Sequence, residues 1–108
     1  MRTRTDRIVR DGLVAVLVSP GYGAGWSTWG LAADRERMLF CPRLVRALES
    51  GAPEADLVKI AHEEFPEAYL AGISQLVVEW VREGKPIRVV EYDGAEHVES
   101  ALDDVVTP

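Results

Sequence analysis

The chain has few of the residues that metal sites, disulfides and catalytic relays require. It contains a single cysteine, Cys41, and two histidines, His62 and His97, among 108 residues. One cysteine cannot close an internal disulfide, and these scattered residues do not have the spacing of zinc ligands. We therefore expect no metal ion, no other cofactor and no disulfide. Such a protein fits the reducing cytoplasm.

Long apolar runs are also missing. No stretch approaches the roughly 20 apolar residues that a membrane-spanning helix needs. The basic residues 1–10 precede the apolar run Leu13 to Val18, and this order superficially resembles a secretory signal. The run is shorter than a signal core and ends at Ser19-Pro20-Gly21. We expect neither a membrane protein nor an exported one.

Positive charge is scarce outside the N-terminus. The net charge is -6, although residues 1–10 hold four arginines against one aspartate. From Asp93 onward, five acids stand without a lysine or arginine. An acidic body repels phosphate backbones, so we expect no general nucleic-acid binding. We expect one domain, residues 1–108, with a flexible arginine-rich arm at 1–10 and a loose acidic tail at 103–108.

The first half of the chain predicts a buried strand followed by two short helices. The valine-rich run Leu13 to Val18 is apolar on both faces, as in a central strand. An apolar stripe after Pro42 predicts a helix over 42–50, ended by Gly51. Pro53 opens a second helix, which Phe65-Pro66 ends. Residues 31–40 stay open, because Met38-Leu39-Phe40 suits either an apolar anchor or an edge strand.

The second half predicts strands. Leu76 to Val81 and Ile87 to Tyr92 alternate in polarity, and the turn between them predicts a β-hairpin. Asp93-Gly94 is a further turn signal, after which Glu96 to Ala101 suits an acidic edge strand. The expected fold class is α+β, a small mostly antiparallel sheet of three to four strands with two short helices on one face. Its order is β-α-α-β-β, with one more β as an option.

The segment from Pro20 to Gly30 is the strongest functional signal. It combines glycines, hydroxyls and two tryptophans directly after a buried strand. Glycine lets a ligand approach the backbone, and aromatic rings offer stacking faces. The spacing matches neither a dinucleotide fingerprint nor a P-loop. We predict a site in which amides and hydroxyls hold an anionic group and rings stack on it, formed by Gly21, Tyr22, Gly23, Gly25, Trp26, Ser27, Thr28 and Trp29, with Tyr92. The alternative is that Trp26 and Trp29 plug the core.

Catalytic candidates are few. Nucleophilic catalysis needs an activated hydroxyl or thiol near a base, and the two histidines suit polar surface positions better. Glu79 and Glu91 would face each other across the expected hairpin, where they would act as an acid–base pair or simply as solvent-facing residues. We favour the second interpretation, assign no catalytic residue, and expect a binding protein more than an enzyme.

The stretch Val14 to Trp29, together with Glu91-Tyr92-Asp93-Gly94, resembles a family of small uncharacterised proteins found in bacteriophages and bacterial genomes. The similarity runs from about Leu13 to Ser100 and leaves out the arginine-rich arm. The resemblance implies a compact accessory protein, of the kind that antagonises a host defence by sequestering a signalling nucleotide or by blocking a protein.

Two functions follow as expectations. The first is a non-catalytic protein that binds a small anionic, nucleotide-like ligand through the glycine- and tryptophan-rich loop. The alternative is a protein–protein interaction module, or an inhibitor of a host defence protein, that binds a basic partner. It would use the acidic surface 91–104, with Glu96, Glu99 and Asp103, and an exposed tryptophan as an anchor.

Overall fold

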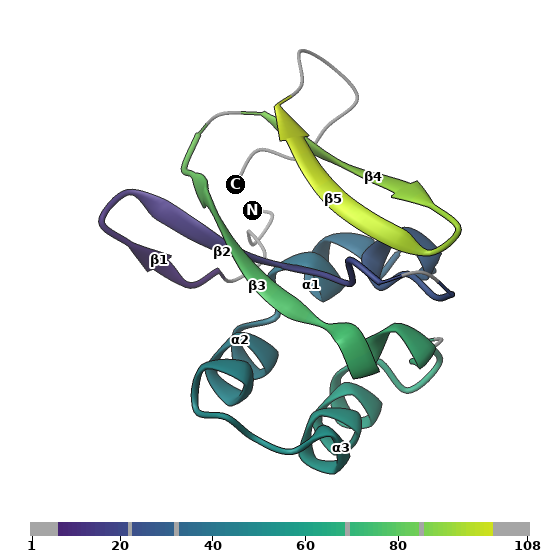
Figure 1. The fold of residues 1–108 in the computed structure, drawn as a ribbon. Coiled ribbons are helices and arrows are strands. Elements are labelled where there is room, and N and C mark those ends of the chain that lie inside the picture. The colour runs from purple at the N-terminus through teal and green to yellow at the C-terminus, as the bar shows by residue number, and fades with distance from the viewer. Residues whose placement is uncertain (1–6, 22, 32, 69, 85, 101–108) are drawn as a thin grey trace.

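Strand β2 (Leu13–Val18) lies at the centre of the protein. The computed structural model describes residues 7–21, 23–31, 33–68, 70–84 and 86–100. In it, β2 pairs antiparallel with β1 (Val9–Arg10) on one side and with β3 (Val77–Arg82) on the other (Figure 1). All residues of β2 after Leu13 are buried. The prediction of a buried central strand is confirmed.

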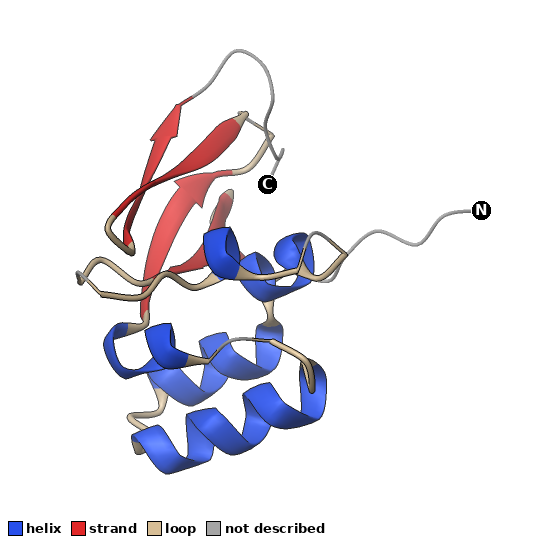
Figure 2. Cartoon of the chain, turned by 90° about the vertical axis from the view of Figure 1, so that its right-hand side faces the viewer, coloured by secondary structure: helices blue, strands red, loops and turns tan. Residues whose placement is uncertain are grey.

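Three α-helices follow β2; the last two lie side by side, whereas the first lies closer to the strands (Figure 2). Helix α2 (Pro42–Glu49) begins at a proline, and Pro53 directly precedes helix α3 (Glu54–Glu64), as predicted. Proline suits the first turn because its missing N–H has no intrahelical acceptor there. Helix α1 (Arg35–Phe40) occupies the segment that the sequence left open, and its last three residues are buried. Two short 3-10 helices, η1 (Ser27–Trp29) and η2 (Ala71–Gln75), lie in the connections.

The two faces of β2 belong to two apolar clusters. Ala15 and Leu17 pack with residues of α2 and α3 in the larger cluster. Val14 and Val16 point the other way and pack with the end of α1 and with Ile87. Successive strand residues alternate between faces, so a strand covered on both sides is apolar throughout. This arrangement explains the uninterrupted apolar run.

The second face of β2 is covered by a hairpin of β4 (Ile87–Tyr92) and β5 (Ala95–Ser100), which forms a separate two-stranded sheet. The expected hairpin of β3 with β4 is therefore wrong. All six residues of β3 pair with β2, and the Glu83 nitrogen extends this pairing by bonding the Gly12 carbonyl at 2.9 Å. The expected α+β class, with antiparallel sheets and short helices, is confirmed.

Residues 7–10, at the end of the expected flexible arm, contact the rest of the protein. The Ile8 carbonyl accepts the Ala15 nitrogen at 3.0 Å, and the Arg10 guanidinium bonds both carboxylate oxygens of Glu49 at 2.6 and 2.7 Å. The Arg7 guanidinium lies 4.0 Å from the centroid of the Phe40 ring and pairs with Glu36 at 2.9 Å. The rest of the expected arm, and the expected tail at 103–108, lie outside the described residues.

Candidate functional site

The loop after β2 is organised around a carboxylate from far along the chain, that of Glu96 on β5. The Glu96 side chain is buried, with 2% of the residue exposed. Its Oε1 accepts the Ser19 nitrogen at 2.9 Å, and its Oε2 accepts the Trp26 nitrogen at 2.8 Å. Thr28 adds its nitrogen at 3.0 Å and its hydroxyl at 2.5 Å, both to Oε2. The loop does gather amides and a hydroxyl around an anionic group, and in this structure that group is the protein's own.

Strand register places Glu96 in this position. Glu96 lies opposite Glu91 and shares a strand face with Val98, which packs into the apolar cluster behind β2. The Glu96 nitrogen also donates to the Ser19 carbonyl at 2.8 Å. The expectation that Glu96 belongs to an acidic, exposed strand face is therefore wrong. The alternation of Glu96 with Val98 was the sequence signal that would have assigned this carboxylate to the inner face.

Trp26 belongs to the core. Its indole nitrogen donates to the Met38 carbonyl at 2.7 Å, and its ring meets Phe65 edge-on at a centroid distance of 6.2 Å. The residue has no exposed surface. The alternative that the loop tryptophans plug the core is therefore correct for Trp26, whose ring has no free face for a ligand. Trp29, at the end of η1, remains 38% exposed.

Glycines in the loop and in the two segments beside it let these parts of the chain approach one another closely. A Cβ on Gly94, in the β4–β5 turn, would lie 2.4 Å from the Ala24 nitrogen. A Cβ on Gly72 would lie 2.3 Å from the Gly25 carbonyl oxygen, and one on Gly21 would overlap the Gln75 side chain. The bond from the Gly23 nitrogen to the Asp93 carbonyl, at 2.7 Å, completes the contact between loop and turn. The loop was expected to admit a ligand close to its backbone; the groups that approach it here are other parts of the protein.

The predicted site residues are thus brought together at one end of the molecule, where the loop after β2 meets the β4–β5 turn (Figure 1). Those that form the frame are Gly21, Gly23, Gly25, Trp26, Ser27 and Thr28. Tyr22 lies outside the described residues. We call the exposed residues of η1 and of the adjoining end of the β4–β5 hairpin the loop–turn surface: Trp29, Glu91, Tyr92 and Asp93. Leu31, which is also exposed, follows Trp29 by two positions in the chain.

The acid–base pair considered from the sequence does not form. Glu79 on β3 lies opposite Val16, whereas Glu91 on β4 lies opposite Glu96 and accepts the Gly94 nitrogen at 2.7 Å. The interpretation depended on a β3–β4 hairpin that does not exist. His97 is exposed, and its Nε2 contacts Glu99 at 2.9 Å. This bond and a further one from Arg88 hold the pKa of Glu99 below its ordinary value.

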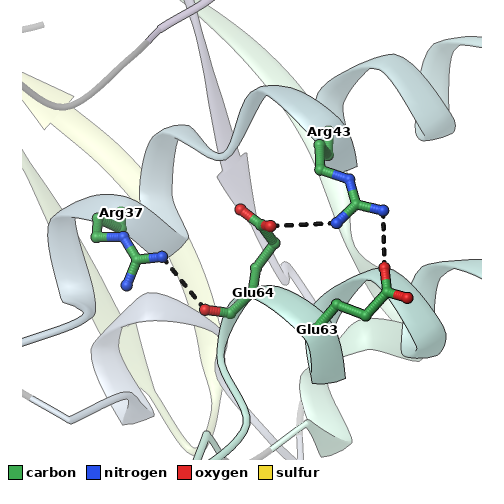
Figure 3. Close-up of polar contacts among 4 residues, drawn as sticks. All are labelled: Arg37, Arg43, Glu63 and Glu64. Carbon is green, nitrogen blue, oxygen red and sulfur yellow. Dashed lines mark hydrogen bonds and ion pairs between the residues drawn. The ribbon is translucent and has the colours of Figure 1, made fainter.

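A second polar cluster joins the helices. Arg43 on α2 bonds Glu63 at 2.8 Å and Glu64 at 3.1 Å on α3, and Arg37 on α1 bonds the Glu64 carbonyl (Figure 3). The hydrogen bond from Arg43 lowers the pKa of Glu63. The hydrogen bonds to Glu63 and Glu64 raise the pKa of Arg43. An open depression of about 360 Å³ beside it is lined by Arg43, Asp56, Lys59, Ile60 and Glu63. Because Arg43 is already paired, we assign this cluster to helix packing.

Comparison of the chain with family models, with curated proteins and with solved structures gives no match. Within the described residues, no three side chains of His, Cys, Asp or Glu come together in a group able to hold a metal ion. No described helix combines the length and the apolar character needed to cross a bilayer. The loop–turn surface is therefore the part of the described structure from which we infer a function.

Proposed function

We propose that this chain is a non-catalytic binding protein that contacts a protein partner through the loop–turn surface. The observation that carries the proposal is that the exposed side chain of Trp29 stands on a backbone segment held in place by Glu96. Trp29 is 38% exposed, whereas buried Trp26 and half-buried Thr28, on either side of Ser27, are both bonded to Glu96. An aromatic side chain on a rigid frame binds at a small entropic cost. Tyr92, 72% exposed on the adjoining turn, supplies a second anchor.

The charge of this end favours a basic partner. Glu91 and Asp93 are exposed beside Tyr92, and the chain carries a net charge of -6. Opposite charges across an interface speed encounter and exclude wrong partners. Glu96 does not belong to this acidic surface, because it is buried. Asp103 lies outside the described residues. The partner would face Asp93 and Glu91 with lysine or arginine.

A nucleotide-like ligand is the alternative proposal. Such a ligand has to compete with Glu96 for the amides of Trp26 and Thr28, because these donors already bond the carboxylate. Stabilisation of the native protein by a nucleotide in a thermal-shift series would support this alternative. The protein-partner proposal needs no such displacement, and we therefore prefer it.

The resemblance to bacteriophage proteins supports a bacterial host protein as the partner, with the chain acting as its antagonist. A cytoplasmic location suits such a role and the single cysteine.

The test is photo-crosslinking in bacterial lysate from a position close to Trp29 in the chain. A benzophenone amino acid at position 31 should capture one predominant protein, and the double variant Trp29→Ala, Tyr92→Ala should lose it. Val9→Ser is the matched control, because Val9 is an exposed apolar residue on β1, away from this surface. Equal capture by the double variant and the control would refute the proposal.

A further inference from the structure

Two turns of the chain share the same two residues and nearly the same backbone conformation. Asp11-Gly12 joins β1 to β2, with φ angles of 51° and 78°. Asp93-Gly94 joins β4 to β5, with φ angles of 50° and 88°. Positive φ at both positions is the signature of a tight two-residue hairpin turn. The two turns differ in what surrounds them.

We propose that Asp11 is a site of spontaneous isomerisation to isoaspartate, and that the fold protects Asp93 from the same reaction. In an Asp-Gly sequence the glycine nitrogen attacks Cγ of the aspartic acid. A C–N bond forms, a C–O bond breaks, and the oxygen leaves as water with the amide proton. Water then opens the cyclic imide at either carbonyl. Opening at the backbone carbonyl leaves the chain running through Cβ, so the net reaction is an isomerisation that consumes nothing.

The Asp11 turn is open to this attack. Asp11 and Gly12 are both exposed, and a Cβ built on Gly12 would meet no atom within 4 Å. Within the described part of the chain, neither the Asp11 carboxylate nor the Gly12 nitrogen has a hydrogen bond. The attack needs a rotation about the Asp11 backbone. The two-residue strand β1, the Arg10–Glu49 contact and the bond from the Glu83 nitrogen to the Gly12 carbonyl flank the turn, but they hold neither the Asp11 carboxylate nor the attacking nitrogen. Short pairings of this kind open at little free-energy cost.

The Asp93 turn is closed to it. The attacking atom, the Gly94 nitrogen, donates to Glu91 Oε2 at 2.7 Å. Gly94 is buried against the Ala24 backbone, and the Asp93 carbonyl accepts the Gly23 nitrogen at 2.7 Å. The hairpin around it has six residues in each strand. Rotation at Asp93 therefore requires the loop–turn contact to separate first.

Isomerisation at Asp11 has a structural consequence. The isoaspartyl link adds a backbone carbon, and a two-residue turn with φ values of 51° and 78° no longer fits it. The pairing of Val9 with Val14 and of Arg10 with Leu13 should then be lost. The bidentate contact of Arg10 with Glu49 would be released with it.

The experiment ages the full chain in water enriched in heavy oxygen, at mildly acidic pH and physiological temperature. Mass spectrometry of peptides then measures the heavy oxygen incorporated at each Asp-Gly site. The same measurement in urea gives the rate of each site in the unfolded chain. We expect Asp11 to react in the folded protein at close to its unfolded rate, and Asp93 to react more slowly than its unfolded rate by roughly tenfold or more.

The variant Asp11→Glu is the control. It keeps the charge, but its longer side chain would have to form an imide ring with one more atom, which closes far more slowly. It should lose the label from the peptide around position 11 and retain the slow labelling at Asp93. Equal suppression of both sites in the folded protein, or faster labelling at Asp93 than at Asp11, would overturn the proposal.

Discussion

Thr28 gives Glu96 two hydrogen bonds, from its nitrogen at 3.0 Å and from its hydroxyl at 2.5 Å, across 68 positions of sequence. This pair joins the loop after β2 to the last described strand. Because η1 begins at Ser27, the pair also holds the base of Trp29. The glycine- and tryptophan-rich loop thus depends on a residue that its own sequence does not contain.

The first prediction concerns Glu96→Gln. A glutamine keeps the size of the side chain but turns one acceptor oxygen into a donor, which then faces an N–H group. We expect a loss of about 2 to 4 kcal/mol in the free energy of unfolding, because buried donors lose their acceptor. Urea denaturation measures it. Glu99→Gln, on the same strand and partly exposed, should cost less than about 1 kcal/mol, and equal losses in the two variants would contradict the role of Glu96.

The second prediction concerns Glu96→Ala, which removes the carboxylate and leaves its donors facing a cavity. A small carboxylate such as acetate should occupy that cavity and raise the stability of the variant with concentration. Chloride at equal ionic strength should not do so, and neither salt should have a specific effect on the native protein. If acetate and chloride act alike on the variant, the loop amides are not an anion site once they lose Glu96.

The fold was predictable wherever one local signal decides an element. The apolar run of β2, Pro42 and Pro53 at the helix starts, and Asp93-Gly94 at a turn are signals of this kind. The pairing of the strands was not predictable from such signals, because the alternating polarity of β3 is compatible with any antiparallel neighbour. In the structure β3 pairs with β2, and β4 forms its hairpin with β5.

The sequence indicated which groups converge at the candidate site, but not which anion they bind. Glycines, amides and a hydroxyl do converge, as the residues between Pro20 and Gly30 indicated. Which anion they hold depends on the register of β5, and that register is a long-range property. Trp26 and Trp29 stand three residues apart, and only tertiary packing decides that the first is buried and the second half-exposed.

The third prediction compares Gly94→Ala with Gly84→Ala. Both glycines have φ near +85°, at 88° and 85°, so both variants carry the same backbone strain. A Cβ at Gly94 would also lie 2.4 Å from the Ala24 nitrogen, whereas one at Gly84 meets nothing within 4 Å. Gly84→Ala should cost about 1 kcal/mol, and Gly94→Ala at least about 2 kcal/mol more. Thermal unfolding of the two variants measures the difference. A similar loss of stability in both would show that the contact between the loop and the turn can adjust to the added Cβ.

The fourth prediction concerns Cys41. Burial raises the pKa of its thiol above the ordinary value, with Glu64 nearby acting in the same direction and backbone bonds acting against it. The folded state therefore keeps the proton at a pH where the unfolded chain, with a thiol pKa of about 8.5, has lost it. Stability should fall as the pH rises above that value, and Cys41→Ala should remove this part of the decrease. Rapid alkylation of the native thiol by iodoacetamide at neutral pH would contradict it.

The last prediction separates the two loop tryptophans by fluorescence. Acrylamide should quench the emission of Trp29, which is 38% exposed, and leave that of fully buried Trp26 almost unchanged. Trp29→Phe should therefore remove much of the quenchable signal. Trp26→Phe should preserve that signal and destabilise the protein by about 1 to 3 kcal/mol, because the Met38 carbonyl loses its donor and the contact with Phe65 shrinks. Trp80 is present in both variants and serves as a common background. If Trp29→Phe left the quenching unchanged, Trp29 would not be accessible from solvent, and the proposed binding surface would lose its main anchor.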